Sequence, residues 1–389
     1  MLYSPAMSNG DSFKGVTAFS EPYCKLHDIY QSYYRNSIAA YCASAGIPFR
    51  EVGSRFPNQL RVLRRIRHSA RFQRSVPGGT KIVDSVAKML GAAQGKTEHV
   101  IGSYIFNQDG VEIKICIDAQ DSRLLIKPDL LEWCDVYFKA NYWPTEVYPA
   151  KVVPIANVNP ACLDKIGLLK SCRHQKKELD LFVSFRVWGG TDELEGVEHG
   201  LALIEALAKV KCRKKVLAYL LAGDISAAVK RLESAGIAWT TKWIPQAELW
   251  GYAAKSRLNI VRHGMHQCVP WRMAEILAMG GCPVMDYEAT TRWHVPLVEG
   301  QHYVHLNLPY RPGAAVGIDT KALTDRVESW VASEELTESI SRNTEQYFDE
   351  HLTPSALGKY ILDYAANRMA ISSPSSATAS SAATRDRLR

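Results

Sequence analysis

The feature that most limits the possible folds is a regular alternation of short apolar runs with amphipathic runs over residues 179–287. The apolar runs have the length of strands, and the runs between them have the length and periodicity of helices. Strands that alternate with helices build parallel βαβ units, so this region is predicted to form a doubly wound α/β sheet. The expected strands lie within 179–190, 215–223, 237–244, 258–265 and 282–287, and the expected helices within 193–210, 224–236, 245–257 and 269–281.

The length of the chain indicates a second domain before this sheet. A chain of 389 residues is too long for one compact core. Hydrophobic residues make up 47% and charged residues 22%, a balance that excludes collagen-like and mainly disordered classes. We expect a first α/β domain over residues 1–160, joined by the Pro-rich stretch 142–168 to a second domain over 161–365. The Ser-, Ala- and Thr-rich residues 366–389 are expected to be a disordered tail.

Polar residues follow the strands expected in the first domain. The clearest of these strands is 111–118, which the turn sequence NQDG precedes, and another is expected over 135–141. Because strand ends line the ligand site of open α/β sheets, these residues are candidates for a site. Turn-forming aspartates and a solvated lysine are the alternative interpretation. The residues are Asp118, Asp121, Lys139 and Asn141.

Composition excludes several other classes of protein. Nine cysteines are scattered without a CxxC pair, which argues against a zinc site or a disulfide framework. The chain has no run of 18 apolar residues and begins with a polar stretch, so we expect a cytoplasmic protein without a transmembrane segment. The 47 basic and 40 acidic residues give a net charge of +7, which favours acidic partners such as nucleotides, anionic glycans or nucleic acid.

Three strand ends in the second domain combine glycine, cations and aromatic residues. The first is Arg186 followed by Gly189 and Gly190, where the backbone and a helix N-terminus suit a phosphate, although such a pair is often only a turn. The second is Lys242 with Trp243, which suit a phosphate and a base or sugar, or else a solvated cation beside a packing aromatic.

The third strand end is the richest in polar groups. Arg262, His263 and Gly264 end a strand, and the helix after the next loop carries Arg272 and Glu275 on one face. A carboxylate there can accept hydrogen bonds from ribose or sugar hydroxyls, and an arginine can neutralise a diphosphate. An Arg–Glu pair within a solvated helix is the alternative.

This third segment resembles the donor-binding region of glycosyltransferases with the GT-B fold, most closely the exostosin-like and group 1 families. The likeness lies in a strand, a polar loop and a helix with Arg272 and Glu275, followed by the turn and strand 280–284. In those families the helix glutamate binds the ribose or sugar, and basic residues upstream bind the diphosphate. Many relatives carry a second glutamate where this chain has Gln267, whose amide can bind a hydroxyl but carries no charge.

The resemblance covers about residues 180–365 and implies two Rossmann-like domains with an interdomain cleft, of which the domain over 1–160 would be the acceptor side. The helical residues 319–351 and 355–369 would be closing helices, the last returning to the first domain.

The implied activity is transfer of a hexosyl group from a UDP- or GDP-sugar to an acceptor hydroxyl, with no metal or other cofactor. Arg186, Lys242 and Arg262 are the expected cations for the diphosphate. An inverting enzyme would also need a general base, for which Asp118 is the first choice and His27 the second.

An Arg-rich stretch over residues 61–74 offers a different function. Its helical spread of cations suits an anionic acceptor, such as a glycan or modified nucleic acid, or else is a solvated face. The alternative hypothesis is a nucleic-acid-binding protein without catalysis, which would use this face. A nucleotide-sugar epimerase is disfavoured because no Gly-rich dinucleotide fingerprint is present. The expected contacts are Arg64, Arg65, Arg67 and Arg71.

Overall fold

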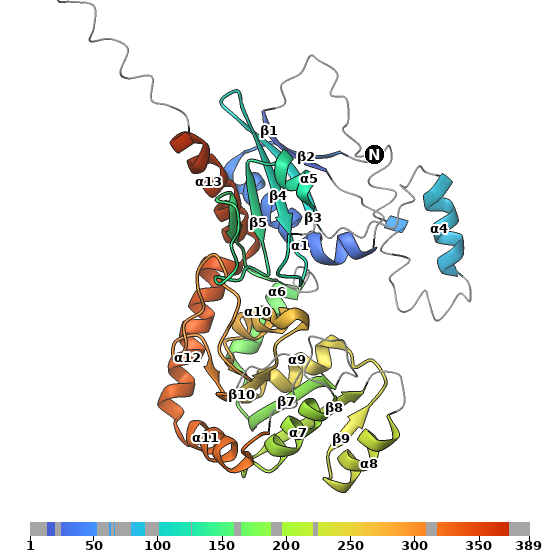
Figure 1. The fold of residues 1–389 in the computed structure, drawn as a ribbon, viewed down its shortest axis with the longest axis vertical. Helices are drawn as coiled ribbons and strands as arrows, with labels where there is room; N and C mark the ends of the chain where they lie inside the picture. Colours follow the sequence, from blue (N-terminus) through green and yellow to red (C-terminus); the bar gives the residue numbers. More distant parts are fainter. Residues whose placement is uncertain are drawn as a thin grey trace, which may run out of the picture.

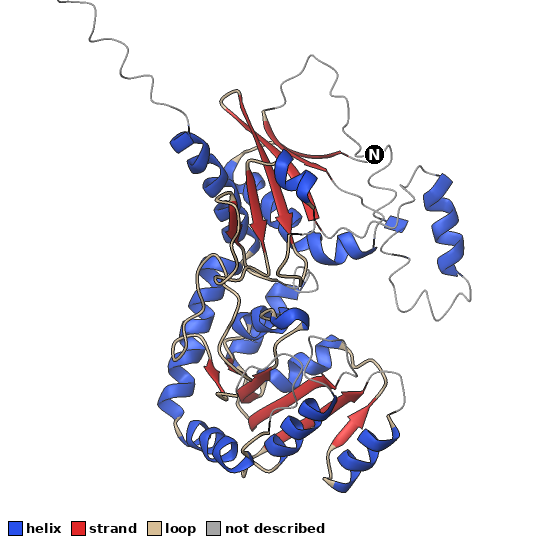
Figure 2. Cartoon of the chain, in the orientation of Figure 1, coloured by secondary structure: helices blue, strands red, loops and turns tan. Residues whose placement is uncertain are grey.

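The chain folds into two α/β domains, each built on one six-stranded sheet (Figures 1 and 2). The computed structural model describes residues 14–19, 25–52, 62–63, 66, 79–89, 101–125, 127–158, 165–187, 197–220, 225–308 and 317–372.

The sheet of the first domain has the strand order β2-β1-β3-β4-β5-β6. It is mixed, because β3 pairs antiparallel with both β1 and β4, whereas the other pairs are parallel. The turn predicted before residue 111 is confirmed: Asp109 and Gly110 both have positive φ and join β3 to β4 as a hairpin. The strands are β1 Gly15–Phe19, β2 Phe49–Val52, β3 Ile101–Gln108, β4 Val111–Asp118, β5 Val136–Lys139 and β6 Val152–Pro154.

The predicted linker 142–168 is partly a structured piece of this domain. It contains β6, which pairs with β5 as an outer strand of the sheet. The described helices of this half are α1 Lys25–Ala45, α4 Gly79–Met89, α5 Pro128–Trp133 and α6 Ile166–Ser171, and a 3-10 turn, η2, covers Cys172–His174.

The second sheet has the order β12-β11-β10-β7-β8-β9, and every pair in it is parallel. The doubly wound sheet predicted from the alternation is therefore confirmed. Its strands are β7 Leu179–Val187, β8 Lys214–Leu220, β9 Ala238–Thr240, β10 Ser256–Val261, β11 Cys282–Met285 and β12 Val304–His305.

Helices cover both faces of this sheet, and β7 shows why. Its alternate side chains point to opposite faces. Leu181 and Val183 pack in a core with α7 and α8, whereas Phe182 packs in a separate core with α9 and α10. The helices are α7 Val197–Ala208, α8 Ser226–Ser234, α9 Gln246–Ala254 and α10 Trp271–Ala278, with a short 3-10 turn, η3, at Met265–Gln267.

The closing helices return the chain to the first domain, as the resemblance implied. In Figure 1, α12 runs along the second domain and α13 lies against α1. At this crossing, a Cβ added to Gly358 would lie 2.1 Å from the carbonyl oxygen of Ser37, so only glycine permits the approach. The elements are α11 Thr320–Ala332, α12 Glu334–Tyr347, a π-helical turn, η4, at Phe348–Leu352, and α13 Pro354–Ser372.

Two α/β domains with a returning C-terminal helix make up the GT-B arrangement, so the expected fold class is confirmed. One apolar core joins the two domains, because it includes Phe138 of β5, Met273 of α10 and Leu357 of α13. The helix α13 extends to Ser372, past the start of the tail expected at residue 366. The remainder of that expected tail lies outside the described residues.

Candidate active site

The carboxyl edge of the second sheet gathers most of the residues predicted to bind a donor. Arg186 lies near the end of β7, and Arg262 and His263 directly follow β10. Asp286 and Tyr287 directly follow β11, which pairs in parallel with β10. Since parallel strands end at the same edge, these side chains share one side of the domain.

His263 forms the most constrained contact at this edge. Its Nδ1 lies 2.5 Å from Oδ1 of Asp286, and its backbone N–H donates to the same oxygen at 3.3 Å. The imidazole stacks on the ring of Tyr287, with a centroid separation of 3.8 Å and an angle of 4° between the planes. Only 2% of the His263 side chain is exposed.

The carboxylate of Asp286 is held in its charged form. Burial alone would raise the pKa of Asp286, but the charge and hydrogen bonds of His263, together with the charge of Arg262, lower it below its usual value. Arg262 Nε lies 4.0 Å from Oδ2 of Asp286, and its guanidinium lies 5.4 Å from the ring centroid of Phe185. The edge therefore carries one buried anion between two potential cations.

Aromatic rings surround the guanidinium of Arg186. It lies 5.6 Å from the ring centroid of Tyr219 on β8 and 5.7 Å from that of Trp243. Trp243 is 67% exposed, and its neighbour Lys242 is exposed as well. A large apolar ring in solvent beside a cation offers a stacking surface for a flat ligand.

Glu275 lies farther inside the domain than a solvated helix carboxylate would. It is 2% exposed, and its Oε2 accepts hydrogen bonds from Gln246 Nε2 at 2.7 Å and Trp250 Nε1 at 2.9 Å. Both donors belong to α9, so the carboxylate ties α9 to α10. Its role toward a ribose or sugar stays a prediction.

Arg272, one turn before Glu275, is also directed inward. Its guanidinium donates to the carbonyl of Ser184 in β7 and lies 5.8 Å from the ring centroid of Phe182. Burial lowers the pKa of Arg272, although the nearby charge of Glu275 opposes this effect. Arg272 therefore ties α10 to β7. Its role in binding a diphosphate stays a prediction.

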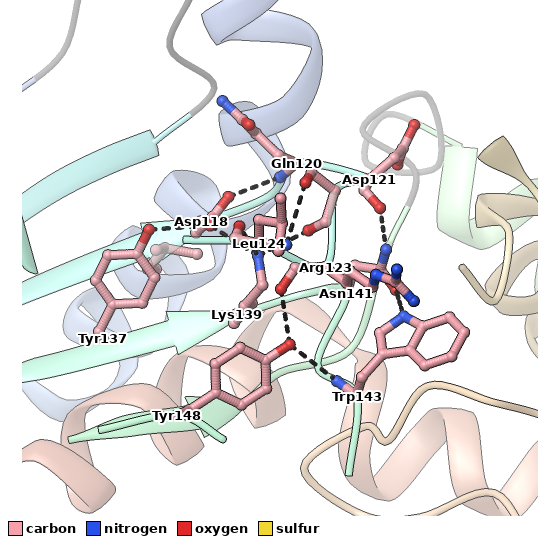
Figure 3. Close-up of polar contacts among 12 residues, drawn as sticks. Asp118, Gln120, Asp121, Arg123, Leu124, Tyr137, Lys139, Asn141, Trp143 and Tyr148 are labelled. Atoms are coloured by element: carbon pink, nitrogen blue, oxygen red, sulfur yellow. Dashed lines mark hydrogen bonds and ion pairs between the residues drawn. The ribbon is translucent and has the colours of Figure 1, made fainter. Parts of the chain in front are cut away.

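In the first domain, Asp118 lies in a closed polar network at the end of β4 (Figure 3). Asp118 and Lys139 are register partners on neighbouring strands and form an ion pair at 3.0 Å, with both side chains fully buried. Tyr137 donates to the same Oδ2 at 2.9 Å, and the backbone N–H of Gln120 donates to Oδ1 at 3.0 Å. Both carboxylate oxygens of Asp118 already accept hydrogen bonds from these groups, so the geometry gives no support to Asp118 as the general base.

The same network fixes the loop that follows β4. Lys139 also donates to the carbonyls of Ser122 at 2.8 Å and Leu124 at 3.2 Å, and Asn141 donates to the carbonyl of Asp121. Figure 3 shows these contacts converging on the loop that carries Asp121. The four polar strand-end residues predicted for this domain are thus brought together, with Asp121 at the open side.

Asp121 contacts the second domain. Its Oδ1 accepts from Sγ of Cys268 at 3.7 Å, and the side chain is half-buried. Burial raises the pKa of Asp121 to about 6, and the negative charge of Asp118 contributes in the same direction, whereas Cys268 and His266 oppose the rise. A carboxylate with this pKa accepts a proton more readily than an ordinary aspartate does.

The loop between β10 and α10 connects the residues at the edge of the second sheet with the polar network of the first domain. Gly264 N–H donates to the carbonyl of Cys268 at 2.9 Å, and a Cβ at Gly264 would lie 2.8 Å from the Cys268 sulfur. His266 and Gln267 both have positive φ, which is uncommon for residues with side chains. This tight loop starts at His263 and contacts Asp121 through Cys268. The carboxyl edge of the second sheet therefore meets the carboxyl end of β4 in the first sheet at this loop.

Further contacts fix the interface between the two domains, here called the seam, beside this loop. Asn157, which follows β6, donates to the carbonyl of Val269 at 3.2 Å and accepts from Trp271 Nε1 at 2.6 Å. Tyr30 of α1 packs edge-on against Trp271, with the ring centroids 5.0 Å apart. These bonds hold the start of α10 against the first domain.

Several predicted site residues lie outside the described residues: Gly189, Gly190, Arg64, Arg65, Arg67 and Arg71. The side chain of His27 is also outside the described part of the chain. Among the residues that the structure describes, no group of three His, Cys, Asp or Glu side chains is placed to hold a metal ion. Within that same part, the helices are too short or too polar to span a bilayer.

Sequence reasoning missed Asp286, Tyr287, Gln246 and Cys268. Asp286 and Tyr287 follow a predicted strand, so their position at the carboxyl edge was the available signal. Nothing in the sequence pairs Cys268 with Asp121, because that contact depends on how the domains meet.

No family model and no curated protein matches the chain. Among solved structures, it is similar to a glycosyltransferase from Rickettsia africae, with 11% identity over 91% of this chain and 97% of that one, at a TM-score of 0.41. It is also similar to Anabaena HepE, solved in complex with UDP-glucose, with 11% identity over 92% and 98% of the two chains and a TM-score of 0.41. Acinetobacter baumannii MurG shares 12% identity over 87% and 96%, at a TM-score of 0.40. Because these values are low, the function of this chain is inferred from its own residues.

Proposed function

We propose that this chain is a glycosyltransferase that moves a sugar from a nucleotide-sugar donor to an acceptor hydroxyl. The observation that carries the proposal is the meeting of the two strand edges at the loop 264–268. Cations and an exposed aromatic lie at the edge of the second sheet, and a carboxylate with a raised pKa lies at the edge of the first. Transfer of a sugar from a diphosphate with inversion uses these two groups side by side, the cations for the leaving diphosphate and the carboxylate for the proton of the acceptor.

We propose that the donor binds to the second domain. In this proposal Trp243 stacks with the base, and Arg186, Lys242 and Arg262 neutralise the diphosphate. Gly189, Gly190 and Gly264 are the further residues proposed to contact the donor. Glu275 and Gln246 form a polar pair that can receive ribose or sugar hydroxyls, with Arg272 behind them. The donor is a UDP- or GDP-sugar that requires no metal in this scheme.

In the first domain we propose Asp121 as the general base in place of Asp118. Asp121 is half-buried at the seam, whereas Asp118 is committed to Lys139 and Tyr137. The acceptor oxygen bonds to the anomeric carbon while the bond from that carbon to the diphosphate oxygen breaks. The proton of the hydroxyl passes to Asp121, and the electron pair of the broken bond leaves on the diphosphate.

We propose an anionic acceptor. An anionic glycan or a modified nucleic acid would suit the Arg-rich stretch 61–74, through Arg64, Arg65, Arg67 and Arg71. We also propose that the transferred sugar is a hexosyl group.

A thermal-shift screen with UDP, GDP, ADP, CMP and their sugar conjugates, with NAD as a control, tests the donor site. A ligand that binds only the folded chain raises its melting temperature, so one nucleotide family should stabilise the protein. Glu275→Ala should abolish that shift, whereas Glu248→Ala, on the exposed side of α9, should retain it. Equal shifts in the wild type and Glu275→Ala would overturn the site assignment.

A further inference from the structure

The imidazole of His263 is fixed in orientation by three contacts. Asp286 binds both its Nδ1 and its backbone N–H, and Tyr287 stacks on the ring. Rotation about the side-chain bonds would break the hydrogen bond and the stacking together. A surface histidine that only adds charge needs none of these supports.

The bond to Asp286 also selects the working atom of the ring. A carboxylate accepts only, so the proton must sit on Nδ1, and Nε2 becomes the atom left to act. Nε2 of His263 is buried and has no hydrogen-bond partner among the described residues. Buried polar atoms in folded proteins are usually paired, so this one indicates a partner that the described residues do not supply.

The charges around His263 indicate that the missing partner is an anion. The charged groups that face it from β10 and β11 are Arg262 and Asp286, and the neighbouring ring of Tyr287 is neutral. Arg186, near the end of the neighbouring strand β7, is a further cation at this edge, so the side chains here attract an anionic ligand. A proton on Nε2 would let the ring donate a hydrogen bond to that anion, while Nδ1–H stays with Asp286.

We propose that Asp286 is a positioning residue that aims Nε2–H of His263 at the leaving diphosphate of the donor. The inference rests on the proposed function and adds a specific role to two of its residues. The hydrogen bond strengthens as negative charge develops on the diphosphate oxygen, without any transfer of the His263 proton. Asp286 touches neither the sugar nor the phosphate, and it acts only through the ring.

Two substitutions of His263 separate its ring nitrogens. The side-chain amide nitrogen of His263→Asn falls near the place of Nδ1 and keeps a donor for Asp286, whereas that of His263→Gln reaches toward the place of Nε2. Calorimetric titration with inorganic pyrophosphate should show affinity reduced by about 10- to 100-fold in His263→Asn and largely retained in His263→Gln. Asp180→Asn, which weakens an ion pair with Arg213 at the opposite edge of the sheet, is the matched control and should bind like the wild type.

Variants of Asp286 test the positioning role. Asp286→Ala should lower kcat for nucleotide-sugar turnover far more than it raises KM, because the lost orientation matters most when charge develops. Asp286→Glu should restore part of kcat. A purely structural role predicts instead that kcat follows the loss of folded protein.

The outcomes distinguish this inference from the proposed function. Pyrophosphate affinity equal in the wild type and His263→Asn would overturn the inference, even if sugar transfer is found. If pyrophosphate affinity depends on Nε2 but no nucleotide sugar is turned over, His263 lies in an anion site and the proposed glycosyltransferase activity is overturned. If His263→Asn fails to fold, the ¹⁵N signals of the wild-type imidazole decide: pyrophosphate should shift Nε2 far more than Nδ1, and an unmoved Nε2 overturns the inference.

Discussion

Cys268 Sγ lies 3.7 Å from Oδ1 of Asp121, although the two residues are 147 positions apart in the sequence. The contact joins a loop of the first sheet to the loop that follows β10 of the second. It puts a carboxyl group whose pKa is about 6 next to the segment that begins with His263. The candidate site therefore depends on the docking of the two domains.

Asp121 should make stability depend on pH. Its folded pKa of about 6 exceeds the ordinary value of 3.8, so its contribution is fully present below about pH 4 and is lost as the pH rises through 6. Asp121→Asn should therefore be more stable than the wild type at pH 7.5 by about 1–3 kcal/mol, and nearly equal at pH 4. Urea unfolding at both pH values measures this, and a difference independent of pH would contradict it.

The buried pair of Asp118 and Lys139 should be costly to break. Lys139→Met leaves a buried carboxylate without its cation, and we expect a loss of about 3–5 kcal/mol in the free energy of unfolding. Glu146→Gln, in the exposed pair with Arg123, should cost less than about 1 kcal/mol. Equal losses in the two variants would show that the network of Figure 3 does not hold this sheet edge.

The crossing of α1 and α13 should tolerate no Cβ at Gly358. Gly358→Ala should destabilise the protein by about 1–3 kcal/mol through the clash with Ser37. Gly251→Ala in α9 has open space around the new methyl group and should be neutral or stabilising by up to about 1 kcal/mol, because alanine favours helix. Denaturant midpoints that rise in both variants would contradict the close approach of the returning helix.

Trp243 should matter for binding and hardly at all for folding. Its ring is 67% exposed, so Trp243→Ala should change stability by about 0.5 kcal/mol or less. Loss of stacking should weaken nucleotide affinity by about 1–3 kcal/mol, measured by calorimetry. Val147→Ala, at a site 98% exposed in the first domain, should leave that affinity unchanged. Unchanged nucleotide affinity in Trp243→Ala would show that the base does not stack on Trp243.

The sequence predicted the second sheet well because local periodicity determines it. The runs from β7 to β11 alternate with helices, and those from β7 to β10 are followed by Gly or Pro, so these elements could be placed without tertiary information. The β3–β4 hairpin was also visible, in the turn at Asp109 and Gly110. The strand β6 was not, because its three residues lie in a Pro-rich stretch and pair only through the sheet.

The choice between two aspartates shows where sequence reasoning ends. Asp118 and Asp121 both follow the same apolar run, and either could be the exposed carboxylate. Their difference arises from pairing: Asp118 is the register partner of Lys139, whereas Asp121 lies in the loop beyond the strand. Which of them meets solvent and the second domain depends on that register and on the packing of α10, neither of which local patterns encode.

Release of UDP or GDP from a panel of nucleotide sugars measures the proposed transfer itself. We expect the wild type to release the diphosphate from one nucleotide family. Asp121→Asn should slow the release by about 100-fold or more, and Asp180→Asn should behave like the wild type. Release at the same rate by the wild type and Asp121→Asn, or no release from any member of the panel, would contradict the proposed function.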